Sequence, residues 1–339
     1  MIDKNVISQS PTRLQRTADI IFRFICNTSA WLTLLLVVFI IFKIAVTAFP
    51  AVKHYGTGFL TGTTWDSQTG EHGILPEIWG TLFTSLLAIL AGTIFGVSAA
   101  IFLSEGFLGQ FIFSILETCK LEIRPLWNKL PERCEDVLKN LIELLAAIPS
   151  VVYGLWGLFV VIPLIRPACN WLNMKLGWIP FFSTTLSGPG VLPAVIVLSI
   201  MILPTITAIS RDALAAVPPK LRMAAYGMGA TRWETILAVI LPVAARGIVG
   251  AVILAFGRAL GETMALAMLV GNANRISVSL FSPANTLAAL LANNFPEAGP
   301  SEVSVLMYAA LVLLAITLVV NIIGSLILQK ASAGMEGGR

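Results

Sequence analysis

The chain has 339 residues, of which 57% are hydrophobic and only 12% are charged. Because soluble domains carry about 25% charged residues, this composition excludes an ordinary soluble domain and indicates a protein with several membrane-spanning segments. The net charge is only +4, and the basic residues are spread over several loops. That spread argues against a nucleic-acid-binding surface.

Six apolar stretches are each long enough for a bilayer-spanning helix of about 20 residues. The first is longer than the apolar core of a signal peptide and follows a charged tail, so it is predicted to be a signal anchor. We expect an all-α membrane protein with an N-terminal part at 1–79, a core at 80–330 and a C-terminal tail at 331–339. The six spans are predicted at 29–49, 80–103, 141–165, 191–209, 247–270 and 305–328.

The basic residues predict the orientation of the chain. Of 22 Lys and Arg residues, 16 lie in the two tails and in the loops at 104–140 and 210–246, whereas four lie in the other three loops. Positive charge concentrates on the cytoplasmic side of membrane proteins, so both termini are expected in the cytoplasm. An inner segment at about 106–135 has mixed charge and interleaved leucines, which predicts amphipathic helices on the inner surface.

Residues that could hold a metal or cofactor are few. His54 and His72 share the first outer loop, and two solvated loop histidines are a better interpretation than a metal site. The four cysteines show no Cys-x-x-Cys spacing, and no Gly-x4-Gly-Lys-Ser/Thr sequence is present, so the chain has no recognisable nucleotide-binding loop. We expect no metal, no cofactor and no enzymatic activity.

The loop between the fourth and fifth spans has a distinctive local pattern. Ala224 and Ala225 favour a helix and permit close packing, and Gly229 can adopt the left-handed conformation that ends a helix. Thr231 is a suitable N-cap for a second helix, with Glu234 three residues later as in a capping box. This pattern predicts two short helices joined by a tight turn.

This stretch resembles the EAA motif of ABC importer permeases, Glu-Ala-Ala-x3-Gly-x9-Ile-x-Leu-Pro, and ends in Leu241-Pro242. The resemblance implies a coupling helix that docks into a groove of an ATPase subunit. Met223 stands where the family has Glu, so a charged contact would have to come from Arg222 or Glu234. The implied coupling residues are Arg222, Met223, Ala224, Ala225, Tyr226, Gly227, Gly229, Thr231 and Glu234.

The fifth span contains two ionisable residues, Arg258 and Glu262. Each costs roughly 2.5–3.5 kcal/mol at the centre of a membrane helix on insertion scales. They are four residues apart and therefore share a helix face. A salt bridge within one helix is the alternative, but Arg before Glu is the less favourable order and buried pairs stabilise weakly. We therefore favour a pathway for a charged solute.

Small residues recur every four positions along the same span, which permits close helix approach in lipid. The ionic pair adjoins this stripe, so it is expected to point to a packed interface or cavity. The stripe consists of Gly247, Ala251, Ala255, Ala259, Thr263, Ala267 and Gly271.

Residues 257–265 and 143–159 resemble the fifth and third helices of permeases of phosphate-specific (Pst) ABC importers of the C type, and Trp65-Asp66 also agrees. The resemblance implies a type I ABC importer fold in which the first helix wraps a neighbouring subunit. It also implies that Arg258 and Glu262 are needed for phosphate passage. A guanidinium matches phosphate oxygens, and Glu262 would hold Arg258 while the site is empty.

Pro149 in the third span would kink that helix or begin its regular part. Ser150 and Tyr153 would then lie near a polar cavity, the alternative being helix packing and interhelical hydrogen bonds. The predicted substrate pathway consists of Arg258, Glu262, Thr263, Ser150 and Tyr153.

The expected function is that of a permease subunit forming half of the pathway of an ATP-driven phosphate importer in the inner membrane of a bacterium. The implied partners are a second homologous permease, two ATPase subunits, an extracytoplasmic phosphate-binding protein and the lipid bilayer. The alternatives are a permease for another oxyanion or a phosphonate and, in a different class, a secondary anion carrier or channel.

Overall fold

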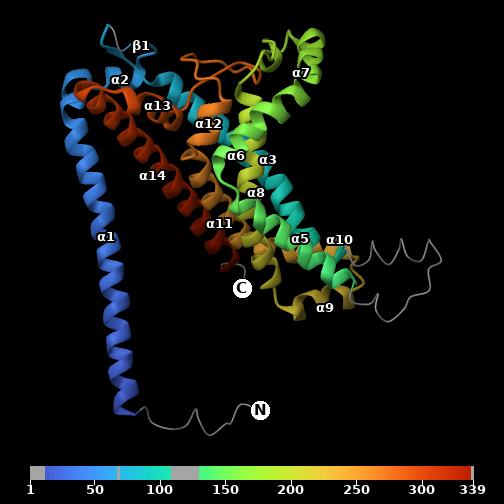
Figure 1. Ribbon diagram of the computed structural model, residues 1–339. Coiled ribbons are helices and arrows are strands. Elements are labelled where there is room, and N and C mark those ends of the chain that lie inside the picture. The colour runs from blue at the N-terminus through green and yellow to red at the C-terminus, as the bar shows by residue number, and fades with distance from the viewer. Residues whose placement is uncertain (1–11, 67–68, 108–129, 337–339) are drawn as a thin grey trace.

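The computed structural model of the protein describes residues 12–66, 69–107 and 130–336. Almost all regular structure within these ranges is helical, as Figure 1 shows. The expectation of an all-α protein with six membrane segments is confirmed. The helices that are long and apolar enough to cross a membrane are Arg13–Tyr55, Leu75–Ser104, Ser150–Leu176, Val191–Ala215, Arg232–Leu260 and Pro300–Gln329.

Most of the segment predicted to form amphipathic surface helices, 108–129, lies outside the described residues, as do the chain ends 1–11 and 337–339.

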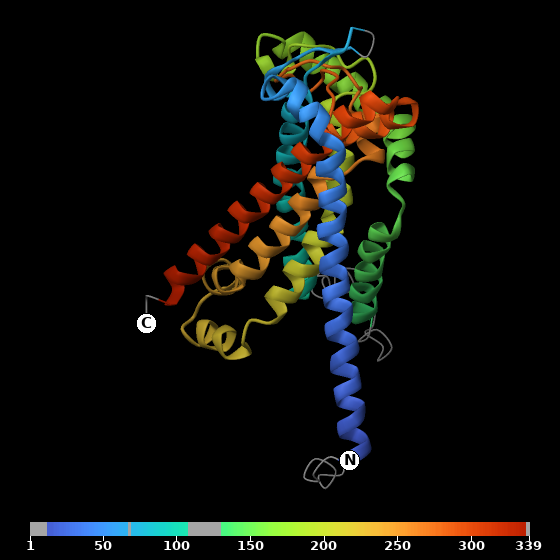
Figure 2. The same ribbon diagram turned by 90° about the vertical axis from the view of Figure 1, so that its left-hand side faces the viewer.

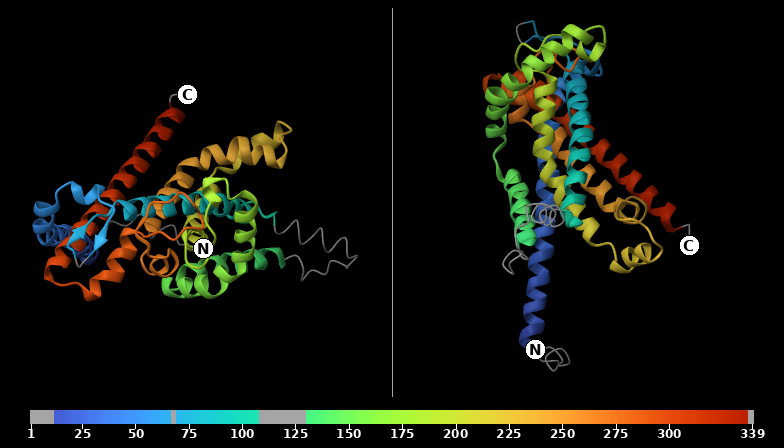
Figure 3. Two further views of the ribbon diagram at one scale, coloured as in Figure 1. Left: turned by 90° about the horizontal axis from the view of Figure 1, so that it is seen from above. Right: turned by 90° about the vertical axis from the view of Figure 1, so that its right-hand side faces the viewer.

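The first helix, α1 (Arg13–Tyr55), stands apart from the rest of the molecule over most of its length (Figures 1 and 2). Its 43 residues span about 64 Å at about 1.5 Å per residue, roughly twice the thickness of a hydrocarbon core. The last turns of α1 pack against α14 (Pro300–Glu336), where the Tyr308 hydroxyl of α14 donates to the carbonyl of Gly56, the C-cap residue of α1, at 3.0 Å. Viewed from above, α1 lies at the edge of the molecule (Figure 3).

The centre of the molecule is the packing of α3 (Leu75–Ser104) against α8 (Val191–Ala215). The glycines of α3 allow this approach, since a Cβ at Gly92 would lie 2.8 Å from Ile202 Cδ1. The Thr207 hydroxyl of α8 also donates to a carbonyl of α3 at 3.2 Å. Small residues are how membrane helices come close enough for such contacts.

The fifth segment packs against both of these helices through its small residues. It consists of α10 (Arg232–Thr235), a π-helical turn at Ile236–Ile240, and α11 (Leu241–Leu260). Ala251, Ala255 and Ala259 are buried completely, which confirms this part of the predicted stripe.

The third segment starts later than predicted. A helix α5 (Leu130–Ala147) ends before Pro149, and α6 (Ser150–Trp156) begins after it. Proline lacks the N–H for a helical hydrogen bond, so the regular helix restarts at Ser150. The predicted span 141–165 therefore began several residues too early, whereas the prediction that Pro149 begins the regular part of this helix is confirmed. The segment continues through a π-helical turn at Gly157–Val161 into α7 (Ile162–Leu176).

The predicted outer loop after the fifth segment is a packed element rather than an irregular connection. It contains α13 (Leu287–Asn294), whose first residues are buried. The segment is tied to α3 by three hydrogen bonds. The Leu287 N–H donates to Thr81 Oγ1 at 2.9 Å, the Asn285 amide donates to Glu77 Oε1 at 3.2 Å, and the Trp79 indole N–H donates to the Ser277 carbonyl at 3.0 Å.

The connections between membrane helices divide between two ends of the molecule, as the predicted topology requires (Figures 1 and 2). The upper end in Figure 1 carries α2 (Gly58–Thr61), the hairpin of β1 (Trp65–Asp66) with β2 (Glu71–His72), a 3-10 turn at Pro180–Phe182, α13 and a second 3-10 turn at Phe295–Glu297. The lower end carries α5, α9 (Pro219–Gly227) and α10. The N-terminal end of α1 and the C-terminal end of α14 also lie on this lower side.

Candidate functional site

The fifth membrane segment is interrupted beside the two ionisable residues. The helix α11 ends at Leu260, and α12 (Met264–Leu269) begins after a break at 261–263. Gly261 has a poor helix propensity, and the Thr263 hydroxyl donates to the Gly261 carbonyl at 3.1 Å, a local bond that competes with helical pairing. The prediction of one unbroken helix over 247–270 is therefore wrong.

Arg258 and Glu262 consequently do not share a helix face. Arg258 lies in the last turn of α11, whereas Glu262 lies in the break and its backbone N–H donates to the Ala259 carbonyl at 3.4 Å. None of the ion pairs among the described residues joins the two side chains. The expected ion pair between Arg258 and Glu262 therefore does not form in this structure.

Arg258 instead lines a groove between α8, α11 and α14. Its Nη1 is 3.5 Å from Thr205 Oγ1, near the middle of the 25-residue α8. No other hydrogen bond of the Arg258 side chain occurs within the described part of the chain. The groove has a volume of about 390 Å³ and is lined by Thr205, Leu254, Gly257, Arg258, Thr317 and Asn321.

Three polar residues of this groove were not predicted. Thr205 lies in the fourth segment, and Thr317 and Asn321 lie four residues apart in the sixth. All three lie in helices of largely apolar composition, and the sequence alone does not say which faces of these helices meet. The spacing of Thr317 and Asn321 was the available signal, because residues four apart share a face.

The other predicted pathway residues lie outside the groove. Tyr153 is only 6% exposed, and its hydroxyl donates to the Leu145 carbonyl at 2.8 Å, across the Pro149 interruption. This contact matches the packing role weighed as the alternative. Ser150 begins α6 and Thr263 precedes α12, both partly buried.

The loop between the fourth and fifth segments has the predicted structure. The short helices α9 and α10 are joined by a turn in which Gly229 has a φ of +86°, the left-handed region that glycine adopts without strain. Thr231 caps α10, and Glu234 Oε2 accepts from the Thr231 N–H at 2.7 Å. The helix pair, the glycine turn and the capping box are all confirmed.

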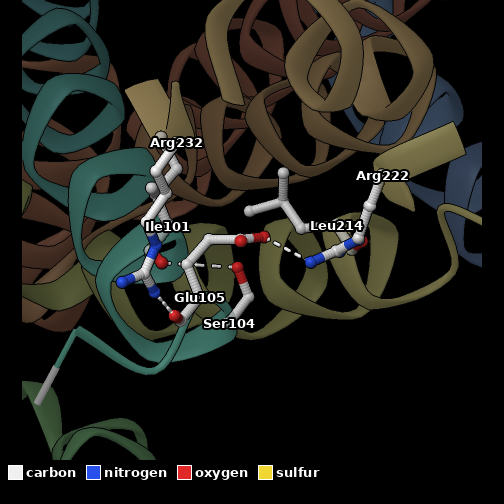
Figure 4. A network of polar contacts seen from close by, with 6 residues as sticks. All are labelled: Ile101, Ser104, Glu105, Leu214, Arg222 and Arg232. Carbon is white, nitrogen blue, oxygen red and sulfur yellow. Dashed lines mark hydrogen bonds and ion pairs between the residues drawn. The ribbon is translucent and has the colours of Figure 1, made fainter. Parts of the chain in front are cut away.

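The Arg222 guanidinium points into the protein and joins α9 to the end of α3 (Figure 4). It donates to Glu105 Oε1 at 2.7 Å and to the Leu214 carbonyl at 2.9 Å. The Glu105 side chain is only 5% exposed. Arg232 of α10 donates to the Glu105 backbone carbonyl and lies over the Phe107 ring, 4.1 Å from its centroid. One end of α3 therefore holds both short helices.

The outward surface of this helix pair is largely apolar. Met223 is 67% exposed and Met228 is 83% exposed, while Ala225 is buried against the body of the protein. Arg222 is engaged with Glu105, and Glu234 is engaged in capping. Both charged side chains are therefore already bound within the chain, and neither is free to take the role of the motif's glutamate, whose position Met223 occupies.

Comparison with known proteins agrees with this architecture. Residues 128–333 match the family described as "Binding-protein-dependent transport system inner membrane component". The chain is 38% identical over 309 residues to the phosphate transport system permease protein PstC of Haemophilus influenzae, covering 89% of this chain and 90% of that protein. It is also 38% identical over 321 residues to the PstC of Mesorhizobium japonicum, covering 93% and 91%.

A solved structure supports the fold independently of close sequence similarity. A chain of a bacterial alginate ABC transporter in complex with its alginate pentasaccharide-bound periplasmic protein aligns with a TM-score of 0.56. The alignment covers 91% of this chain and 94% of that chain at 15% identity, and it confirms the ABC importer transmembrane architecture. The chain belongs to the family of inner membrane components of binding-protein-dependent transport systems.

Proposed function

We propose that this chain is the permease subunit of an ATP-driven phosphate importer and forms half of its translocation pathway. The observation that carries the proposal is the Arg258 guanidinium, which lies in a groove level with the middle of α8 and has one hydrogen-bond partner among the described residues. Relatives that align over about nine-tenths of the chain carry the name of phosphate transport system permeases, which supports the same substrate.

The chemistry of the groove favours an anion. A guanidinium has five N–H donors and matches the oxygens of phosphate in a two-pronged contact. The groove lining contains Arg258, two threonines and an asparagine, but no carboxylate. An arginine costs roughly 2.5–3.5 kcal/mol at the centre of a membrane helix, and an anion in transit would offset part of that cost.

The basic residues support an orientation with both termini in the cytoplasm. The 16-to-4 distribution of Lys and Arg favours a cytoplasmic location for the lower end in Figure 1, with α9 and α10. The upper end then faces the extracytoplasmic phosphate-binding protein. The full importer would contain a second homologous permease and two ATPase subunits, in the inner membrane of a bacterium.

The surface of α9 supports an ATPase contact that depends on apolar side chains. Met223 and Met228 are exposed, and methionine adapts its shape to a partner groove. Movement of α9 would reach α3 through the Arg222–Glu105 ion pair. This chain would supply no nucleotide site and no cofactor of its own.

Uptake by the reconstituted complex tests the proposed function. The two permeases and two ATPases are placed in vesicles with ATP inside and the loaded binding protein outside. Labelled phosphate, arsenate and sulfate are compared, with vesicles containing ADP as the control. We expect ATP-dependent uptake of phosphate in preference to sulfate.

Two results would contradict the proposal. Preferred uptake of sulfate or of a phosphonate would assign the chain to another oxyanion. Equal phosphate uptake with ADP or with this permease alone would indicate a secondary carrier or channel.

A further inference from the structure

The sixth membrane segment forms one wall of the groove that Arg258 lines. Thr317 and Asn321 lie one helical turn apart on α14, on the face that meets α11. The two helices approach closely there, since a Cβ at Gly324 would lie 2.8 Å from Ile253 Cγ1. Both residues line the same groove as Arg258, and Asn321 is exposed in the isolated chain.

The Asn321 amide lies directly beside the arginine-bearing turn of α11. Its Oδ1 is 3.3 Å and its Nδ2 is 3.6 Å from the position that a Cβ on Gly257 would occupy. No hydrogen bond to the Asn321 side chain occurs within the described ranges. A primary amide offers two N–H donors, and a polar group without a partner in an apolar helix is costly.

Thr205, on α8, supplies a third donor to the groove. Its Oγ1 accepts from Arg258 Nη1 at 3.5 Å, which leaves the hydroxyl hydrogen available to another acceptor. The Thr317 hydroxyl, in contrast, donates to the Leu313 carbonyl of its own helix at 2.9 Å. The groove therefore combines a cation with N–H and O–H donors from three different helices.

We propose that Thr205 and Asn321 bind the transported oxyanion together with Arg258, as donors from α8, α14 and α11, and that Thr317 shapes the wall between them. This inference rests on the proposed function and extends it to residues of the fourth and sixth segments. A tetrahedral oxyanion presents acceptors in several directions, so donors from three helices that line one groove bind it better than the guanidinium alone. Glu262 lies outside this set.

Two substitutions of similar size test the contact of Asn321 with the anion. Asn321→Leu removes both polar atoms, and Asn321→Asp replaces the donor with a negative charge. In the vesicle assay we expect Asn321→Leu to slow phosphate uptake roughly tenfold, as loss of a hydrogen bond to a charged group does. Asn321→Asp should slow uptake about 100-fold or more, because like charges repel at short range.

Two conservative substitutions test the contact of Thr205 with the anion. Thr205→Val keeps the shape and removes the hydroxyl, and it should slow uptake roughly tenfold. Thr205→Ser keeps the hydroxyl and should restore most of the rate. The matched control is Ser325→Ala on α14, whose hydroxyl donates to the Ile322 carbonyl and lies outside the groove. This control should stay within about twofold of the unmodified complex.

A purely structural role of Asn321 predicts equal losses for the two variants, and that result would overturn the inference. Equal rates for Thr205→Val and Thr205→Ser would overturn it as well. Failure of the proposed function gives a different pattern: the unmodified complex would prefer sulfate, and the ordered losses at Asn321 would then appear with sulfate as the labelled probe.

Discussion

At the scale of single residues, the most informative contact is the ion pair between Glu105 and Arg222. With Met223 in place of the motif's glutamate, a charged contact from this loop to an ATPase would have to come from Arg222 or Glu234. The Arg222 side chain binds Glu105 at the end of α3 instead. Met223 occupies the position of the motif's glutamate, and its side chain is exposed. The Arg222–Glu105 ion pair therefore holds α9 against α3, and Met223 and Met228 are exposed on the outward surface.

The Glu105–Arg222 pair leads to a prediction about stability. Glu105→Ala leaves the partly buried Arg222 without its partner, which costs about 3 kcal/mol in the free energy of unfolding. The matched control is Asp19→Ala, which breaks the exposed Asp19–Arg23 pair of α1 and should cost less than about 1 kcal/mol. Unfolding of the purified chain in detergent measures both.

A double-mutant cycle separates the pair from other effects of the substitution. Arg222→Met should cost less in the Glu105→Ala background than in the unmodified chain, because the partner is already gone. Equal costs in the two backgrounds would show that the contact contributes nothing to stability.

At the scale of elements, the segment at 271–299 is held against the start of α3 by backbone contact. A Cβ added at Gly80 would collide with the Asn285 carbonyl, a main-chain atom that cannot rotate away. The neighbouring Asn285–Glu77 hydrogen bond lies in the same buried place. Because of this packing, the segment predicted as an outer loop is part of the buried core.

Gly80→Ala should therefore destabilise the protein by about 3 kcal/mol or more, at the upper end of the cost of overpacking. Gly250→Ala is the matched control, since a Cβ at this helical glycine meets nothing within 4 Å. It should be neutral or stabilise by up to about 1 kcal/mol, as alanine favours helices over glycine. Thermal unfolding distinguishes the two, and equal midpoints would contradict the expected backbone collision.

The elements also show what could be predicted from the sequence. The six membrane segments depend on apolar length, and the turn at Gly229 with its capping box depends on neighbouring residues, so both were predicted correctly. The effect of Pro149 was predicted, and the regular helix does begin after it. The span around it was nevertheless placed too early, and the break at 261–263 was missed, because an apolar run continues across both interruptions. They are decided by backbone hydrogen bonding rather than by hydropathy.

The groove residues could likewise be predicted from the sequence only in part. Arg258 was found from the sequence because a charge in an apolar helix is costly. Its neighbours Thr205 and Asn321 were not found, since they come from helices far apart in the chain and meet only through tertiary packing. The assumed pairing with Glu262 failed because it required an unbroken helix.

At the scale of the whole molecule, much apolar surface is left uncovered. The side chains of α1 are exposed along most of the helix, and α14 is exposed on one side towards its C-terminal end. Arg258 is itself exposed in the isolated chain, and a charge at this depth is not stable against lipid. A homologous permease that covers the groove would enclose the pathway between two subunits.

The most direct measurement is phosphate uptake by the reconstituted complex with Arg258→Ala in this chain, beside Arg258→Lys and the unmodified complex. We predict that Arg258→Ala lowers the uptake rate roughly 100-fold or more, as removal of a desolvated charged partner does, while ATP hydrolysis continues. Arg258→Lys should retain part of the rate because it keeps the charge but loses the fork of donors. Unchanged uptake by Arg258→Ala would contradict the assignment of phosphate passage to this groove.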